Sequence, residues 1–439
     1  MQLKIPTIFN EEIGITGSPD FFLKRHGSNG TLNKVKPEDS AAHNWYRFVL
    51  SYPPHLVRDY LEKFGANGAN VVLDPFCGTG TTIVESKKNG LTAIGIEPNP
   101  VPHFASTTKT QWGIDAGKFF EHAQSIAAIY SKRIKESERQ LLDPEKEKLL
   151  LKNSISPEPL HKFLILQQII REQEKTPYFD YELLALAKAL VFSISNLHFG
   201  PEVGVRNIKQ DADVIGSWFK EITIMRDDIQ ELSHLNHPFT TIHRADARSL
   251  NHLLSPNSID IVITSPPYPN EKDYTRTTRL ESVLLGFINN KEGLREIKRS
   301  LVRSNTRGIY VIDNDDNWVR DNVEINRIAF EIEKRRIDLG KTSGFERNYA
   351  RVTKLYFGGM VRHLAELRSK LKPGAMLAYV VGDQASYLQV MIRTGQILAD
   401  IAESLGYEVV SIDLFRTRIA TATREQLREE ILVLRWPQK

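Results

Sequence analysis

The sequence predicts an α/β fold built on a mostly parallel sheet. The first support is the stretch from Val71 to Glu97, where an apolar run, a helical segment and a second apolar run follow one another closely. Strand, helix and strand at this spacing form a βαβ unit, whose two strands are parallel. The second support is that the same alternation resumes at Phe239 and continues towards the C-terminus.

The first elements each have a local reason to form. The stretch Tyr46–Phe64 is expected to be helical, with Tyr52-Pro53-Pro54 preceding or opening the helix, because proline is tolerated in a first helical turn. Strands are expected over residues 71–74 and 92–97. The helix between them is expected over residues 81–88, because Asn89-Gly90 is typical of a helix C-terminus.

The second half of the chain repeats this pattern. Strands are expected over residues 240–244, 259–264, 376–381, 407–414 and 430–436, and helices over residues 352–371 and 390–405. Lys372-Pro373-Gly374 is expected to be a turn, since proline and glycine both favour turns. The last two strands have no helix between them, which favours an antiparallel hairpin.

A different pattern separates the two α/β parts. Apolar residues recur at steps of three and four from Phe119 to Ile134 and from Ile215 to Ile229, which indicates amphipathic helices. The sequence therefore predicts a core over residues 41–110 and 238–439, and a helical insertion over residues 111–237 that packs on the sheet or forms a separate lobe. Residues 1–40 contain several glycines and are expected to form an irregular arm.

Composition limits the class of protein. The 439 residues are 41% hydrophobic and 26% charged, as is usual for soluble globular proteins. No apolar run approaches the ~20 residues of a membrane span, and Met1–Phe22 shows no secretory signal, so a cytoplasmic location without a membrane partner is expected. The net charge of +4 permits a nucleic-acid partner without requiring one.

The single cysteine, Cys77, narrows the chemistry further. It excludes a disulfide within the chain and argues against a cysteine-based zinc site, so no metal cofactor is expected. Zinc-dependent base deamination needs several such ligands and is excluded. Methylation of cytosine at C5 uses a cysteine nucleophile, and the single cysteine argues against this reaction. Cys77 lies inside a glycine turn, where its expected role is to fill a small space.

The glycine turn after the first strand is the strongest candidate cofactor site. A sharp turn from strand to helix brings backbone amides close to a ligand, and glycine permits this approach. Glu97, at the end of the next strand, is suited to bind the two hydroxyls of a ribose. The spacing of the glycines differs from the dinucleotide-binding fingerprint and the sequence has no phosphate-loop motif, which weakens both of these alternatives. A purely structural glycine turn stays an alternative. The expected cofactor-binding residues here are Asp74, Phe76, Gly78, Gly80, Thr81 and Glu97.

A second corner, Ser265-Pro266-Pro267-Tyr268, ends a later strand and is the expected catalytic site. An exocyclic amine of a nucleobase is a poor nucleophile because its lone pair conjugates into the ring. Hydrogen bonds accepted by the Ser265 side chain and the Pro266 carbonyl would orient that lone pair, and the two prolines hold the acceptors rigidly. Tyr268 is expected to stack on the base. The two corners together predict methyl transfer from S-adenosylmethionine.

Other polar residues have weaker support. Asp246 follows a strand and is expected either to accept a hydrogen bond from the adenine of the cofactor or to be an exposed loop acid. The run after Tyr268 and the basic stretch Lys291–Arg307 either contact nucleic acid or form solvated surface. The candidate nucleic-acid contacts are Tyr274, Arg276, Arg279, Lys298, Arg299 and Arg303.

These motifs resemble the amino-methyltransferases that act on DNA, over roughly residues 43–110 and 238–439. The resemblance implies a Rossmann-like class I methyltransferase fold, with a seven-stranded, mostly parallel sheet and an antiparallel last strand. Ser265-Pro266-Pro267-Tyr268 is similar to the cytosine-N4 branch, because Asp or Asn at the first position is more typical of the adenine-N6 branch. The segment Trp45–Pro54 resembles the N-terminal cofactor-binding element of the family, which implies a cofactor contact for Tyr46.

The leading hypothesis is a site-specific DNA methyltransferase acting on N4 of cytosine after base flipping. Its partners would be double-stranded DNA and a cognate restriction endonuclease, and the insertion is a candidate target-recognition lobe. The rivals are an adenine-N6 DNA methyltransferase, a tRNA guanine-N2 methyltransferase and a non-enzymatic scaffold of the same fold. The sequence identifies neither the recognised site nor the oligomeric state.

Overall fold

The computed structural model describes residues 32, 34–48, 51–200, 202–270, 272–419 and 425–437. These residues form two compact units, which we describe separately. The N-terminal unit comprises residues 35–249 and 272–301, and the C-terminal unit comprises residues 250–271 and 302–439 together with residues 1–34. The predicted irregular arm over residues 1–40 falls largely outside the described residues.

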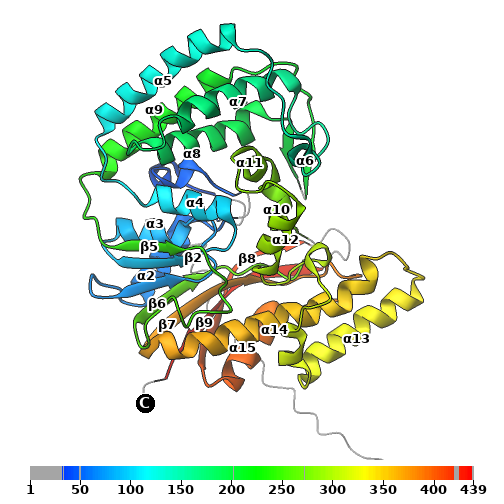
Figure 1. The fold of residues 1–439 in the computed structure, drawn as a ribbon. Coiled ribbons are helices and arrows are strands. Elements are labelled where there is room, and N and C mark those ends of the chain that lie inside the picture. The colour runs from blue at the N-terminus through cyan, green and yellow to red at the C-terminus, as the bar shows by residue number, and fades with distance from the viewer. Residues whose placement is uncertain are drawn as a thin grey trace, which may run out of the picture. The chain divides into compact units, whose positions relative to one another are not determined.

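The core strands form one seven-stranded sheet in the order β5-β2-β1-β6-β7-β9-β8 (Figure 1). In the N-terminal unit, β2 (Thr92–Ile96) pairs in parallel with both β1 (Val71–Asp74) and β5 (Thr240–His243). In the C-terminal unit, β6 (Ile259–Thr264) and β7 (Leu371–Gly382) are parallel. The predicted α/β class, with a mostly parallel sheet of seven strands, is confirmed.

The last strand is antiparallel, as predicted. β9 (Gln426–Arg435) lies between β7 and β8 (Glu408–Ile419) and is antiparallel to both. β8 and β9 are both longer than expected, since each continues as part of a long hairpin. Helix α15 (Thr394–Ser404) packs on β7, β8 and β9, and α14 (Tyr349–Leu367) packs on α15 and on α13 (Val323–Asp338).

The βαβ unit forms where the sequence predicts it. β1 occupies residues 71–74 and α3 (Thr81–Lys88) follows the glycine turn. Helix α2 (Pro54–Lys63) begins at the second proline of Tyr52-Pro53-Pro54, so the prediction of a helix from Tyr46 was wrong for its first residues. The reason is local, because a residue that precedes proline is pushed out of the helical region.

The predicted insertion is helical but also contains a short hairpin. Its helices α5, α7, α8 and α9 form a layer in the upper part of Figure 1, and α8 packs on α9 and on α4. They share one hydrophobic core with Val84 of α3 and Val101 of α4. Helix α4 (Pro100–Lys109) precedes this region. The elements of the region are α5 (Ala116–Glu136), α6 (Pro144–Glu147), α7 (Pro157–Arg171), α8 (Phe179–Ala189), the π-helix η3 (Leu190–Ile194), the hairpin β3 (Leu197–Phe199) and β4 (Val203–Val205), and α9 (Val214–Leu232).

Short helices follow the catalytic corner Ser265-Pro266-Pro267-Tyr268 along the chain. The segment after Lys272 forms α10 (Tyr274–Thr277), α11 (Arg279–Leu284) and α12 (Lys291–Arg299), all in the N-terminal unit. The remaining short turns are η1 (Pro37–Asp39), η2 (His43–Trp45), η4 (Thr306–Gly308), η5 (Asp315–Val319), η6 (Glu346–Asn348) and η7 (Arg368–Lys370).

Two predictions in the C-terminal unit were wrong. Lys372-Pro373-Gly374 is not a turn before β7 but part of it, where the register with β6 jumps from Leu371 to Met376. The positive φ of Gly374 (84°) accommodates this bulge. The helix expected from residue 390 begins at Thr394 instead, because a loop with two positive-φ residues, Leu388 and Gln389, precedes it.

Candidate active site

The turn between β1 and α3, residues 75–80, is called the glycine corner here, and its two glycines have different surroundings. Both have positive φ, 49° at Gly78 and 84° at Gly80, a conformation that glycine adopts readily. A Cβ at Gly80 would lie 2.8 Å from Cβ of Ser106 on α4, so this glycine allows close packing of the corner. A Cβ at Gly78 would meet no atom within 4 Å. The open space at Gly78, just before the N-terminus of α3, fits a bound ligand.

Asp74 is buried at the end of β1 and fixes the shape of the corner. One carboxylate oxygen accepts from the N–H of Phe76 at 3.1 Å, and the other accepts from the hydroxyl of Tyr52 at 2.9 Å. The Tyr52 hydroxyl also contacts Thr82 on α3. Burial and the nearby charge of Asp74 raise the pKa of Tyr52 well above its usual value, so Tyr52 stays a neutral donor. The sequence prediction missed Tyr52 at this corner.

Glu97 lies against the glycine turn. Its carboxylate accepts from the N–H of Gly78 at 3.0 Å and from the N–H of Asn99 at 2.7 Å. Burial raises the pKa of Glu97 to about 7, although the two backbone hydrogen bonds oppose the shift. An acid next to an open glycine turn fits a ligand that carries a nucleoside, because each carboxylate oxygen can accept further hydrogen bonds.

Tyr46 does not present its side chain at this corner. Its ring is buried in the hydrophobic core and its hydroxyl donates to the buried carboxylate of Glu281 on α11. The contact with the corner is made instead by Lys109 on α4, which the sequence prediction missed. Its buried ammonium donates to the carbonyl of Thr79 at 2.7 Å and to the carbonyl of Tyr46 at 3.2 Å. Burial lowers the pKa of Lys109 to about 7.

The remaining predicted residues of the turn have structural positions. Thr81 is buried as the first residue of α3, and Phe76 is half-buried beside Asp74. Cys77 is buried and a Cβ on Gly95 of β2 would lie 2.9 Å from its sulfur, so Cys77 fills a tight space between strand and turn.

The catalytic corner follows β6 directly, as predicted. The Ser265 hydroxyl donates to the carbonyl of Val380 on β7 at 3.2 Å. Since this bond uses its only proton, the oxygen of Ser265 is left with acceptor lone pairs for another group. Pro266 is buried, and Pro267 and Tyr268 are half-buried, so the corner combines a fixed backbone with a partly accessible ring.

Gly382, at the end of β7, determines where the Tyr268 ring lies. A Cβ at this position would be 2.9 Å from Cε2 and 3.4 Å from Cδ2 of Tyr268. The ring therefore packs on the bare backbone of Gly382, which the sequence did not reveal.

Replacing Gly382 by alanine is expected to displace the Tyr268 ring. The added methyl group overpacks the contact and should cost about 1–3 kcal/mol of stability or shift the ring. Turnover should fall while the affinity for S-adenosylmethionine is unchanged, as measured by steady-state kinetics and by calorimetry. Gly344→Ala is the matched control in the same unit, because its Cβ would meet nothing within 4 Å and its φ is not positive. Unchanged turnover in Gly382→Ala would show that the ring position does not matter.

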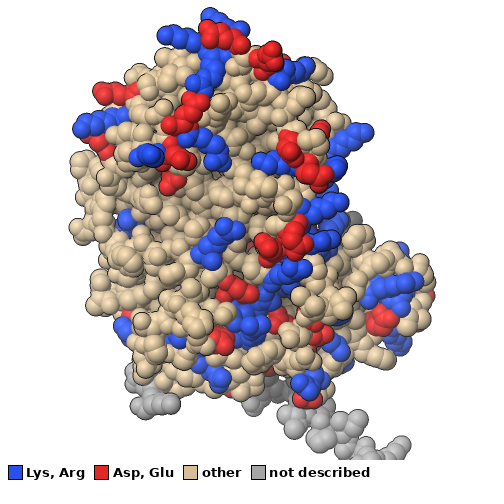
Figure 2. All heavy atoms as spheres, in the orientation of Figure 1, with Lys and Arg blue, Asp and Glu red and all other residues tan. Residues whose placement is uncertain are grey.

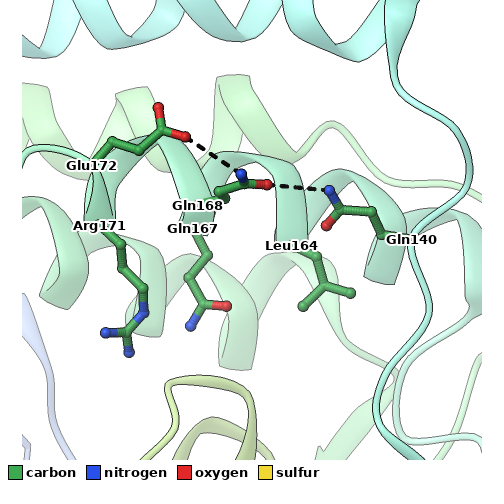
Figure 3. Close-up of a pocket in the computed structure, with 6 residues that line it drawn as sticks. All are labelled: Gln140, Leu164, Gln167, Gln168, Arg171 and Glu172. Carbon is green, nitrogen blue, oxygen red and sulfur yellow. Dashed lines mark hydrogen bonds between the residues drawn. The ribbon is translucent and has the colours of Figure 1, made fainter.

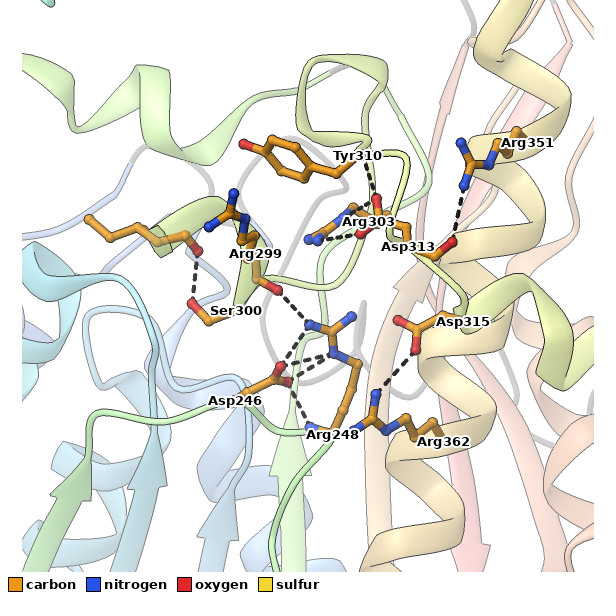
Figure 4. A network of polar contacts seen from close by, with 11 residues as sticks. Asp246, Arg248, Arg299, Ser300, Arg303, Tyr310, Asp313, Asp315, Arg351 and Arg362 are labelled. Carbon is orange, nitrogen blue, oxygen red and sulfur yellow. Dashed lines mark hydrogen bonds and ion pairs between the residues drawn. The ribbon is translucent and has the colours of Figure 1, made fainter. Parts of the chain in front are cut away.

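Asp246 is engaged in a local ion pair (Figure 4). Both of its oxygens accept from the guanidinium of Arg248, at distances of 2.7–3.1 Å, and Arg248 also donates to the carbonyl of Arg299. The structure thus adds an ion pair to the two roles that the sequence predicted, and the adenine contact stays a prediction. Asp246 holds Arg248, which is buried, against the end of α12.

Most of the candidate nucleic-acid contacts are paired within the protein. Lys298 forms an ion pair with Asp273 at 2.9 Å, and Arg279 donates to the backbone of α10. Arg276 lies 3.8 Å from Glu202, and Tyr274 is half-buried. On the face of the molecule that Figure 2 shows, acidic and basic side chains are interspersed.

Two arginines of the basic stretch differ in exposure. Arg299 is 43% exposed and pairs with Glu292 on the same helix, so it can still reach a phosphate. Arg303 is only 4% exposed and is held by Asp313, so its contact with nucleic acid stays a prediction that this ion pair does not favour. Breaking this buried ion pair would leave both the guanidinium of Arg303 and the carboxylate of Asp313 without a partner inside the protein, which is costly.

A pocket of about 410 Å³ lies on α7 (Figure 3). Gln167 and Arg171 donate from its wall to the carbonyls of Leu284 and Leu285, which end α11. These bonds satisfy helix-terminal carbonyls, so the pocket has a structural explanation. Its lining residues are Gln140, Leu164, Gln167, Gln168, Arg171 and Glu172.

The described residues offer neither a metal cluster nor a membrane span. Within these ranges, no three His, Cys, Asp or Glu side chains are placed to hold a metal ion. No helix among them has the length and apolar character that a membrane crossing requires.

Comparison with known proteins adds independent information. Residues 29–103 match the N6/N4 methyltransferase family, described as DNA methylase. The type II methyltransferase M.BsoBI of Geobacillus stearothermophilus is 24% identical over 438 residues, which cover 88% of this chain and 83% of that protein. The type II methyltransferase M.AvaI of Anabaena variabilis is 25% identical over 455 residues, which cover 92% of this chain and 88% of that protein.

Similar solved structures are more distant. They include TrmN from Thermus thermophilus, with a TM-score of 0.27 and 11% identity over 87% of this chain and 48% of that one. The rRNA methyltransferase aviRa from Streptomyces viridochromogenes has a TM-score of 0.31 and 11% identity over 91% of this chain and 94% of that one. Likenesses of this size say nothing about the site.

The sheet order and the glycine corner define a class I methyltransferase fold, the class that uses S-adenosylmethionine. Within this class, the chain is similar to the N6/N4 DNA methylases, whose family model matches residues 29–103, and is a DNA methyltransferase. The resemblance inferred from the two sequence motifs is thereby confirmed at the level of the family.

Proposed function

We propose that this DNA methyltransferase transfers a methyl group to N4 of cytosine at a specific site in double-stranded DNA. The observation that carries the proposal is the Ser265 hydroxyl, which donates to Val380 and so offers its oxygen only as an acceptor. A neutral acceptor next to two prolines and a partly accessible tyrosine suits an amino group that must be held without being protonated.

The catalytic corner acts by orienting the target base. Ser265 Oγ and the Pro266 carbonyl accept hydrogen bonds from the two amino hydrogens, which directs the nitrogen lone pair out of the ring plane. Tyr268 stacks on the ring, a contact worth ~1–3 kcal/mol. A paired base inside a duplex cannot reach such a corner, so the enzyme must act on a base flipped out of the helix.

The glycine corner holds the methyl donor. When bound, S-adenosylmethionine would supply the methyl group from its sulfonium, whose sulfur keeps the bonding electron pair, and the amine nitrogen that gains the methyl group would release a proton to water. Gly78 leaves room for the donor, Glu97 accepts from the ribose hydroxyls, and Asp74 with Tyr52 keeps the corner in shape. The two corners need no metal for this chemistry.

The names of the relatives support a proposal for the biological setting. Both M.BsoBI and M.AvaI are named type II methyltransferases. We infer that this chain has the same role in a restriction-modification system, where it would protect cytoplasmic DNA from a nuclease with the same site. The helical insertion over residues 111–237 is our candidate for the target-recognition element.

Product analysis tests the proposed function directly. The purified protein is incubated with methyl-labelled S-adenosylmethionine and, in parallel, with duplex DNA or tRNA, and the labelled nucleoside is identified. We expect label in N4-methylcytosine and only with DNA. Label in N6-methyladenine would move the enzyme to the other branch of the family, and label in tRNA alone would reject a DNA substrate. Methylation-aware sequencing of a host that expresses the chain then identifies the site.

The affinity for S-adenosylmethionine is expected to depend on pH through Glu97. The pKa of this buried acid is raised to about 7 in the free protein, and the ribose hydroxyls favour its ionised form. Donor binding should therefore strengthen as pH rises through about 7, with a change of about tenfold between pH 6 and pH 8. Calorimetry of the wild type and of Glu97→Gln checks this. The variant should bind more weakly and with a flat profile, and an equal slope in both would assign the dependence to another group.

The raised pKa of Glu97 makes the stability of the free protein change with pH in the opposite direction to donor binding. The pKa of Glu97 is higher in the folded protein than in the unfolded chain, so folding favours the protonated acid. Its contribution to stability is therefore fully present below the unfolded value of 4.5 and is lost as pH rises through about 7. Stronger donor binding at high pH would thus occur in a slightly less stable free protein, which separates the two effects.

A further inference from the structure

A buried lysine lies directly against the glycine corner. Lys109, the last residue of α4, is 1% exposed, and its ammonium donates to the carbonyl of Thr79 at 2.7 Å. Thr79 stands between Gly78 and Gly80, so this bond reaches the centre of the corner. A second bond, at 3.2 Å, goes to the carbonyl of Tyr46. The lysine reaches this position because α4 packs on α3, which follows the corner (Figure 1).

The ammonium of Lys109 has no counter-charge in the part of the chain that the structure describes. Both of its hydrogen bonds go to neutral carbonyls, and no described carboxylate forms an ion pair with it. Burial, followed by the positive charges of Arg47, Lys88 and Lys188, lowers its pKa. The nearby thiol of Cys77 stays neutral, because burial raises its pKa well above the usual value. A buried cation without an anion costs free energy, so the protein keeps an uncompensated positive charge at this corner.

The start of α3 adds partial positive charge to the same place. The helix follows Gly80 directly, and no described side chain caps its N-terminus. The free N–H groups and the dipole of a helix favour an anion at this end. Gly78 leaves open space beside it, since a Cβ there would meet no atom within 4 Å. A buried cation, a helix N-terminus and an open turn together suit a small anionic group of a ligand.

We propose that Lys109 is a positioning residue for the methyl donor, and that its charge holds the carboxylate of the donor's methionine part at the glycine corner. The buried acids Asp74 and Glu97 lie at the same corner, and they would repel a carboxylate unless a cation offset them. Lys109 supplies this cation, and its bond to Thr79 fixes the turn that receives the ligand. The inference rests on the proposed function only for the identity of the donor and not for the target base.

The test compares two ligands that differ only in the carboxylate. Decarboxylated S-adenosylmethionine keeps the sulfonium, the ribose and the amino group of the donor. Calorimetric titration of the full-length protein at about pH 6 keeps Lys109 charged, since its pKa is about 7. The wild type should bind S-adenosylmethionine about tenfold or more tightly than the decarboxylated ligand. Equal affinity of the wild type for both ligands would overturn the proposal, and this comparison does not depend on the folding of any variant.

Two variants of Lys109 separate its charge from its hydrogen bond. Lys109→Met removes both, and Lys109→Gln keeps an amide that can donate to the Thr79 carbonyl. Both should lose about tenfold in affinity for S-adenosylmethionine and less than about threefold for the decarboxylated ligand. Equal losses for the two ligands, or wild-type affinity in Lys109→Gln, would assign a purely structural role to this residue. Thermal unfolding measures the stability that each variant loses.

Lys88→Met is the matched control in the same unit. Lys88 also donates to a carbonyl, that of Ala41 at 2.7 Å, but this carbonyl lies outside the glycine corner. The variant should therefore bind both ligands as the wild type does. A loss confined to S-adenosylmethionine and as large as that of Lys109→Met would assign the selectivity to the net charge of the unit and overturn the proposal. A wild type that binds neither ligand would instead reject the glycine corner as the donor site, and with it the proposed function.

Discussion

Replacing Tyr268 by alanine is expected to lower turnover by about one to two orders of magnitude with little effect on donor binding. The ring provides the stacking surface for the target base, and stacking of this kind is worth ~1–3 kcal/mol per base. The ring packs on Gly382 within the C-terminal unit, whereas the glycine corner belongs to the N-terminal unit. Methylation kinetics and titration with S-adenosylmethionine measure the two effects separately.

Tyr268→Phe is the matched control for this experiment. Phenylalanine keeps the stacking surface and loses only the hydroxyl, so most of the turnover should be retained. Comparable losses in the phenylalanine and alanine variants would assign the effect to the hydroxyl. A loss of donor affinity in Tyr268→Ala equal to that of the variants at the glycine corner would show that the two roles are wrongly assigned.

Gly78→Val is expected to have the reverse effect and to weaken donor binding on the order of 100-fold, about 2.7 kcal/mol. Gly78 has φ 49°, and no atom lies within 4 Å of the place that a Cβ would take, so a valine would extend into the open space that fits the donor. The backbone conformation itself adds a cost of ~1–2 kcal/mol for a residue with a Cβ, and more for a β-branched one. Calorimetric titration and thermal unfolding distinguish the two costs.

Gly65→Val is the control for the backbone cost. Gly65 also has a positive φ, 64°, and open space around its missing Cβ, but it lies in the turn after α2. Both variants should lose a similar amount of stability, and only Gly78→Val should lose donor affinity. If Gly65→Val weakened donor binding to the same extent, general strain would explain the result and Gly78 would have no special place in the site.

The elements around the glycine corner can be predicted because their causes are local. β1 ends and α3 begins where the sequence places them, since the turn residues and the stop at Asn89-Gly90 act over a few positions. The same holds for β6 and the Ser-Pro-Pro-Tyr corner that follows it. The bulge at Lys372-Pro373-Gly374 could not be told from a turn, because bulges and turns use the same residue types. Only the pairing of β7 with β6 shows that this segment is a bulge.

The partners of the charged and polar site residues cannot be predicted in this way. A basic run predicts a DNA contact for Arg303, yet its guanidinium is neutralised by Asp313 inside the protein. The family resemblance implies a cofactor contact for Tyr46, yet its hydroxyl donates to Glu281, which is distant in the sequence. Lys109 shows no motif at all, and its position under the glycine turn depends on the packing of α4.

The sequence by itself determined the class of protein, because a strand-end glycine turn and a Ser-Pro-Pro-Tyr corner are short motifs whose chemistry is fixed by adjacent residues. Only the tertiary structure decided which side chains support those motifs and which charges are already paired. The physical reason is that burial and pairing depend on groups brought together from distant parts of the chain, and neither composition nor spacing records these contacts.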